Sequence, residues 1–177
     1  MSLYKEMGIE DKVEAARANL HRLKKETMVY THVSSDGSIA VDTSDPGYVT
    51  LQSRIASLES SLQTVSALAD AIQAELVTQG VTTIAALREA REVHNNTIHS
   101  GPLRAWDQLR LFHERPVGQH GYPAHLPSDL CEVSEYAAIE GAIRAEMEAA
   151  AAALVMLNAS LETIGGLSGE ARAALRD

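Results

Sequence analysis

A heptad repeat of apolar residues between positions 48 and 76 places the tightest limit on what this chain can fold into. One series is Leu51, Leu58, Val65 and Ile72, and the second, offset by four, is Tyr48, Ile55, Leu62, Ala69 and Leu76. A seven-residue period keeps one apolar seam on one side of a helix along its whole length. The pattern therefore predicts a helix over 46–79, roughly 45 Å long at a 1.5 Å rise per residue.

The residues that flank this helix agree with its predicted ends. Asp45 is suited to cap its N-terminus, and Pro46 suits the first helical position because a proline there loses no intrahelical hydrogen bond. Gly80 follows the last apolar position and can adopt the left-handed conformation that commonly ends a helix.

The partner of the seam can lie in the same chain or in another one. We name eight of its residues the interaction stripe: Tyr48, Leu51, Ile55, Leu58, Leu62, Val65, Ile72 and Leu76. A second long helix is predicted over 128–164, with Ser128 as its cap, a similar apolar stripe along it, and Gly165-Gly166 at its end. The simplest arrangement packs the two long helices antiparallel in one bundle. The alternative places the interaction stripe between subunits, because a heptad looks the same in both cases.

The first 45 residues predict a helix followed by a hairpin. Apolar residues at alternating spacings of four and three predict an amphipathic helix over 9–27, within an N-terminal segment 1–28. In the segment 29–45, β-branched residues alternate on both sides of Asp36-Gly37, which is a strong turn signal. An isolated two-stranded hairpin is marginal in water, so this one must pack on helices or pair with strands of another chain.

The remaining chain, 46–177, is predicted to be a helical bundle with a connector rich in histidine and proline at 94–127. A short helix beginning near Thr82 or Thr83 is expected to break in the segment 94–101, and another begins near Pro102. Residues 116–127 hold three of the five prolines and are expected to form a loop. The fold class is therefore mainly α: a long-helix bundle or coiled coil with one small β-hairpin.

Charge and composition exclude several classes of partner. The net charge is −9, and residues 129–177 carry nine acidic and three basic side chains. Nucleic acid and acidic membrane surfaces attract basic proteins, so neither is expected as a partner. The longest apolar run, 149–156, is far shorter than a membrane span of roughly 20 residues. No secretory signal is visible, and Cys131 is the one cysteine, so we expect a cytoplasmic protein or a component of a particle assembled inside the cell.

Histidines supply the main candidate for a metal site. Five of the seven lie between 94 and 125, and the weak candidate ligands are His99, His113, His120 and His125. His94 and His99 are five residues apart, which places them about 140° out of phase on a helix rather than on one face. We therefore predict no metal ligand and treat these side chains as surface or capping histidines.

No residue pattern indicates catalysis. Cys131 near a helix N-terminus could have a lowered thiol pKa, but no oxyanion motif accompanies it, and a small apolar filler is the simpler interpretation. Nucleotide-binding, zinc-protease and serine-hydrolase motifs are missing from the sequence. We predict no catalytic residue, no bound cofactor and no enzymatic activity.

Three functional hypotheses follow. The leading one is a structural or assembly protein that forms homo-oligomers or docks into a larger complex through its long helices. A virion or similar particle component would fit this hypothesis by fold-level analogy. The second is a helical-bundle metal-binding enzyme or ligand-binding domain with its site in 94–131. The third is an acidic adaptor that binds a basic partner protein through its C-terminal third.

Overall fold

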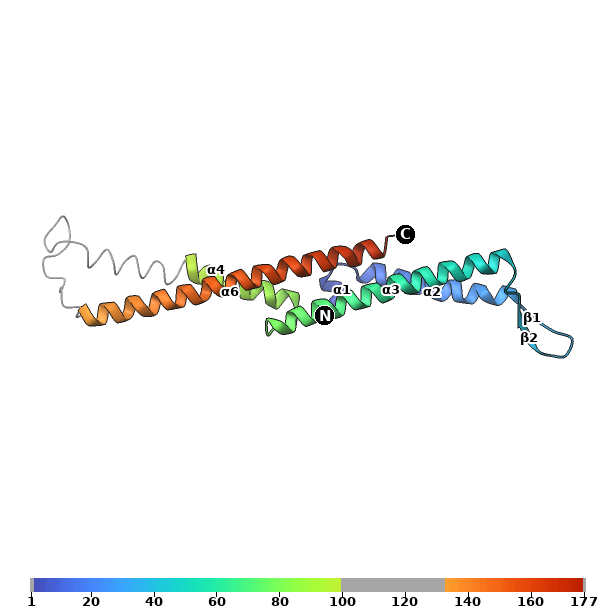
Figure 1. The fold of residues 1–177 in the computed structure, drawn as a ribbon, viewed down its shortest axis with the longest axis horizontal. Coiled ribbons are helices and arrows are strands. Elements are labelled where there is room, and N and C mark those ends of the chain that lie inside the picture. The colour runs from blue at the N-terminus through green and yellow to red at the C-terminus, as the bar shows by residue number, and fades with distance from the viewer. Residues whose placement is uncertain (1, 100–132, 177) are drawn as a thin grey trace. The chain divides into compact units, whose positions relative to one another are not determined.

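The computed structural model describes residues 2–99 and 133–176, which Figure 1 draws as a coloured ribbon. The chain divides into two compact units. Unit 1 comprises residues 1–84 with 162–177, and unit 2 comprises residues 85–161. The described residues are helical apart from one hairpin and its connections, so the mainly α class with a small β-hairpin is confirmed.

Unit 1 begins with a short helix that the sequence analysis did not predict, α1 (Leu3–Glu6). Ser2 caps it by accepting a hydrogen bond from the Lys5 amide at 3.3 Å. It ends at Gly8, whose φ of 69° lets the Ile9 amide donate back to the Tyr4 carbonyl at 2.9 Å. This sharp reversal leads directly into α2 (Glu10–Glu26), which confirms the predicted N-terminal helix.

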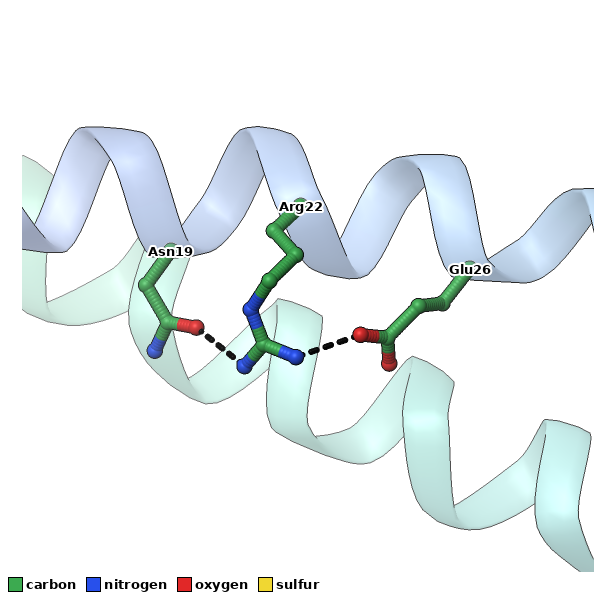
Figure 2. A network of polar contacts seen from close by, with 3 residues as sticks. All are labelled: Asn19, Arg22 and Glu26. Carbon is green, nitrogen blue, oxygen red and sulfur yellow. Dashed lines mark hydrogen bonds and ion pairs between the residues drawn. The ribbon is translucent and has the colours of Figure 1, made fainter.

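Asn19, Arg22 and Glu26 form a network of polar contacts along α2. Figure 2 shows Arg22 bridging the other two residues: its guanidinium donates to Asn19 Oδ1 at 2.8 Å and pairs with the Glu26 carboxylate. Exposed pairs at this spacing stabilise a helix by about 0.3–0.5 kcal/mol each. This network therefore supports the helix locally.

A 3-10 turn, η1 (Thr27–Tyr30), links α2 to the hairpin strands β1 (Thr31–Val33) and β2 (Ile39–Val41). The predicted hairpin is confirmed, although Val29 and Tyr30 belong to η1 and not to a strand. The turn between the strands closes when the Gly37 amide donates to the Ser34 carbonyl at 2.9 Å. Gly37 then adopts a φ of 83°, which favours glycine because that conformation is left-handed.

Helix α3 (Pro46–Thr78) confirms the predicted long helix and both of its end signals. Asp45 Oδ1 accepts a hydrogen bond from the Gly47 amide at 2.7 Å, and Pro46 occupies the first turn. At the other end, Gly80 has a φ of 69°, and the Val81 amide donates to the Leu76 carbonyl at 3.1 Å. This back-bonding satisfies carbonyls that would otherwise have no partner at the end of the helix.

Helices α2 and α3 pack side by side in unit 1, on opposite sides of the hairpin in sequence. Leu23 near the end of α2 packs with Leu51 and Ile55 near the start of α3, and Leu20, Tyr30 and Leu58 cover this cluster. A salt bridge of 2.6 Å between Lys24 and Glu59 joins the same two helices at the surface. Because the ends nearest the hairpin meet, the two helices run antiparallel.

Helix α4 (Ile84–His99) is the predicted short helix. The amide of Ile84 at its start donates to Glu6 Oε2 at 2.6 Å, so a carboxylate distant in sequence caps this helix. Its last described residue, His99, lies within the segment 94–101 in which the helix was expected to break. Half-buried Ile98 extends the apolar spacing of Ile84 and Leu87, which favours continued helix.

Helix α6 (Val133–Ala174) corrects one predicted boundary. The prediction that Gly165-Gly166 ends this helix is wrong, because the helix passes through both residues and reaches Ala174. Ala150, Leu157, Ile164 and Ala171 are buried and lie seven residues apart, so the apolar seam continues beyond the glycines. The glycines themselves lie on the exposed side with open space around them. Burial along the seam therefore outweighs the loss of helix propensity, about 1 kcal/mol for each glycine.

The same helix contains one segment, Gly141–Ala174, that is long and apolar enough to cross a membrane. Its best window has a mean hydropathy of 1.4, and 22% of that window is buried. The continuous apolar run considered in the sequence analysis is shorter, because the window also includes isolated polar residues. Core helices of soluble proteins also have this composition, so length and hydropathy alone carry no functional argument.

Candidate interaction surface on the hairpin

The register of the hairpin separates its side chains into two faces. Thr31 pairs with Val41, His32 with Ala40, and Val33 with Ile39. Successive side chains of a strand point to opposite faces, so Val33, Ile39 and Val41 share one face with Thr31. His32 and Ala40 share the other face. We name the three aliphatic residues Val33, Ile39 and Val41 the hairpin apolar face.

This apolar face is open to solvent in the isolated chain. Val33 is 71% exposed and Ile39 is 74% exposed, and both form one cross-strand pair. Met28 and Val29 in the adjoining turn η1 are also largely exposed. Single exposed aliphatic side chains are common on protein surfaces, whereas a contiguous group is typical of an interaction site.

The carboxylates around the hairpin are held by local hydrogen bonds. The Ser38 hydroxyl and amide donate to Asp36 Oδ1 at 2.6 and 2.9 Å, and these bonds lower the pKa of Asp36 below its ordinary value. The Ser44 hydroxyl and amide donate to Asp42 Oδ1 at 2.8 and 3.1 Å and lower the pKa of Asp42 in the same way. Both groups therefore carry negative charge at neutral pH.

The base of the hairpin is fixed to the start of α3 by aromatic packing. The rings of Tyr30 and Tyr48 meet edge to face with centroids 5.7 Å apart. The Asp42 amide donates a hydrogen bond to the Tyr30 carbonyl at 2.9 Å, and this bond joins the two ends of the hairpin. An open hollow of about 510 Å³ lies beside Tyr30 and is also lined by Gly47, Leu51 and Arg54.

Most of the predicted interaction stripe is buried within the chain. Leu51, Ile55, Val65, Ile72 and Leu76 are buried, and Tyr48, Leu58 and Leu62 are half-buried. The five buried side chains are not available as an open surface. Whether a second chain also contacts the half-buried members stays a prediction.

Of the weak candidate metal ligands, only His99 falls in the part of the chain that the structure describes. It is exposed at the end of α4. His113, His120, His125 and Cys131 lie outside the described residues. In the described ranges, 2–99 and 133–176, no group of three histidine, cysteine, aspartate or glutamate side chains could hold a metal ion.

The hairpin was predicted from the sequence, but its exposed apolar face was not. The strand alternation assigns Val33, Ile39 and Val41 to one face once the register is fixed. Whether helices cover that face depends on tertiary packing, which cannot be predicted from the strand pattern.

No protein-family model, curated protein or solved structure matches this chain.

Proposed function

We propose that this chain is a non-enzymatic assembly protein that binds other protein chains through the hairpin apolar face. The observation that carries this proposal is the exposure of Val33 and Ile39 as a cross-strand pair on a hairpin fixed to long helices. In this role the helices act as the scaffold and the hairpin as the contact.

Two physical arguments support the hairpin as the contact. A two-stranded sheet leaves the outer edge of each strand without a neighbouring strand, and such edges readily accept a further strand. Covering an aliphatic side chain on binding contributes about 25 cal/mol for each Å² of apolar surface removed from water. A partner strand or helix laid on this face would gain from both effects.

The geometry around Tyr30 favours a prepositioned hairpin. The Tyr30–Tyr48 contact and the Asp42–Tyr30 hydrogen bond tie the hairpin base to α3. A surface held in place before binding loses less conformational entropy when the partner arrives, and this increases affinity.

The direct test is the absolute mass of the purified protein, measured by light scattering over a hundredfold range of concentration. We expect a fixed or growing multiple of the 19.0 kDa chain, reduced by the double substitution Val33→Ser/Ile39→Ser. His32→Ser is the matched control, because His32 lies on the opposite face of the same strand.

Two results would contradict the proposal. A 19.0 kDa monomer at every concentration, together with crosslinking in the native source that traps no partner at the hairpin, would contradict it. Equal masses for the Val33→Ser/Ile39→Ser variant and for His32→Ser would remove the hairpin apolar face from the assembly.

A further inference from the structure

We propose that the hairpin of one chain docks into a basic groove between α2, α3 and the C-terminal end of α6 in a second copy. This inference rests on the proposed function, because it names the occupant of the hairpin surface. Its two halves, a groove and a hairpin of opposite charge, both lie within unit 1.

The groove has a volume of about 630 Å³. Its charged lining residues are Lys12 from α2, Arg54 from α3 and Arg176 beyond the end of α6, all with exposed side chains. No acidic side chain lines it among the described residues, and none of these three cations forms an ion pair there. A basic groove is unexpected in a chain whose net charge is −9.

The floor of the groove can receive apolar side chains. Half-buried Leu58 lines the groove, together with Leu23, which is 1% exposed and belongs to the core between α2 and α3. Ala15 and Ser57 also line the groove, and their small side chains allow the backbone of a partner to approach the groove closely. The groove therefore offers an apolar floor with cations around it.

The hairpin has the opposite charge. Asp36, Asp42 and Asp45 lie in or beside it, and the chain contains no lysine or arginine from residue 27 to residue 53. Asp36 and Asp42 are both exposed, and the hydroxyl and amide of one serine donate to Oδ1 of each carboxylate. The hairpin thus combines an apolar face with carboxylates, and the groove combines an apolar floor with cations.

Such complementarity has measurable consequences. Opposite charges steer the two surfaces together and fix their orientation, and salt weakens this effect when the groups are exposed. The two surfaces differ, so each chain would offer one of each kind. A reciprocal exchange of hairpins would close a two-fold dimer, and one contact per pair of chains would form rings or open chains.

The experiment uses charge reversal on the full chain, with sedimentation velocity at low and high salt as the readout. The groove variant is Lys12→Glu/Arg54→Glu, and the hairpin variant is Asp36→Lys/Asp42→Lys. Lys5→Glu/Arg88→Glu is the control, because both residues are exposed and neither lines the groove. Asp36→Asn/Asp42→Asn serves as a second hairpin variant that keeps a hydrogen-bond acceptor in each turn.

We expect the wild type and the control to self-associate, and each charge-reversed variant to associate at least about tenfold more weakly. Mixing the groove and hairpin variants should restore association, because the reversed charges then face each other. Raising the salt should weaken the wild-type complex. Failure of the mixture to associate, or association of both variants like the wild type, would overturn the docking mode.

The apolar variant separates this inference from the proposed function. If Val33→Ser/Ile39→Ser abolishes association but both charge variants associate like the wild type, the hairpin remains the contact and the groove is not its site. If the wild type does not self-associate but crosslinks through the hairpin to another protein, docking into a second copy is overturned and the proposed function stands. If neither kind of variant changes the association, both fail.

Discussion

The Tyr30 hydroxyl lies so close to Gly47 that a β-carbon at that position would come within 2.5 Å of the hydroxyl oxygen. Tyr30 ends the turn that follows α2, and Gly47 lies in the first turn of α3. The missing side chain at position 47 therefore lets the ring cover the start of α3. This contact holds the hairpin base on the two helices that support it.

We expect Gly47→Ala to lower the free energy of unfolding by about 1–3 kcal/mol, because the new methyl group collides with the Tyr30 hydroxyl. In the Tyr30→Phe background the nearest ring atom would be Cζ, at 3.3 Å, so Gly47→Ala should cost less there. Urea denaturation of the two single variants and the double variant measures this coupling. Strictly additive effects would show that the close approach does not constrain the fold.

Gly165→Ala and Gly166→Ala should each stabilise the protein by about 0.4–1 kcal/mol. Both residues are helical and exposed, and an added β-carbon meets no atom within 4 Å at either site. Alanine reduces the conformational freedom of the unfolded chain, which glycine leaves large. Thermal and urea unfolding provide the measurement, and destabilisation by either substitution would contradict a continuous α6.

Ile72→Ala should lower the free energy of unfolding by about 2–5 kcal/mol, because Ile72 is 0% exposed in the seam of α3. Val77→Ala is the matched control on the same helix, and we expect a change of at most about 0.5 kcal/mol because Val77 is 66% exposed. The cost of Ile72→Ala should not depend on protein concentration, since the seam is buried within one chain. A strong concentration dependence would place this part of the interaction stripe between subunits.

Acid should loosen the two turns that flank β2. The pKa of Asp36 is lowered by the Ser38 hydroxyl and amide, and that of Asp42 by the Ser44 hydroxyl and amide. A carboxyl group with a lowered folded pKa stabilises the fold fully above its unfolded pKa, and this contribution is lost as the pH falls through the folded pKa. The loss should therefore fall below about pH 4.

Amide chemical shifts of Ser38 and Ser44, followed from pH 6 to pH 2, test this pH dependence. Ser38→Ala should move the titration of Asp36 to higher pH and leave that of Asp42 in place. Titration of Asp36 at the same pH in the wild type and in Ser38→Ala would show that the serine hydroxyl does not hold the carboxylate.

Local signals in the sequence were sufficient for the main elements of unit 1. Asp45-Pro46 and Gly80 marked the ends of α3, and Asp36-Gly37 marked the hairpin turn. Such signals succeed because caps and tight turns depend on a few neighbouring residues. They failed at Gly165-Gly166, where the continuing apolar spacing of Ile164 and Ala171 favours helix despite two residues that disfavour it.

Periodicity and local hydrogen bonding were enough to predict the helical class, the heptad seam of α3 and the hairpin. Tertiary packing buries Ile72 and Leu76 within the chain and leaves Val33 and Ile39 exposed, and neither result follows from the sequence pattern. It also brought Lys12, Arg54 and Arg176 to one groove from three separate segments. Burial and charge clustering depend on which faces meet in space, and a one-dimensional pattern of apolar and charged residues does not contain that information.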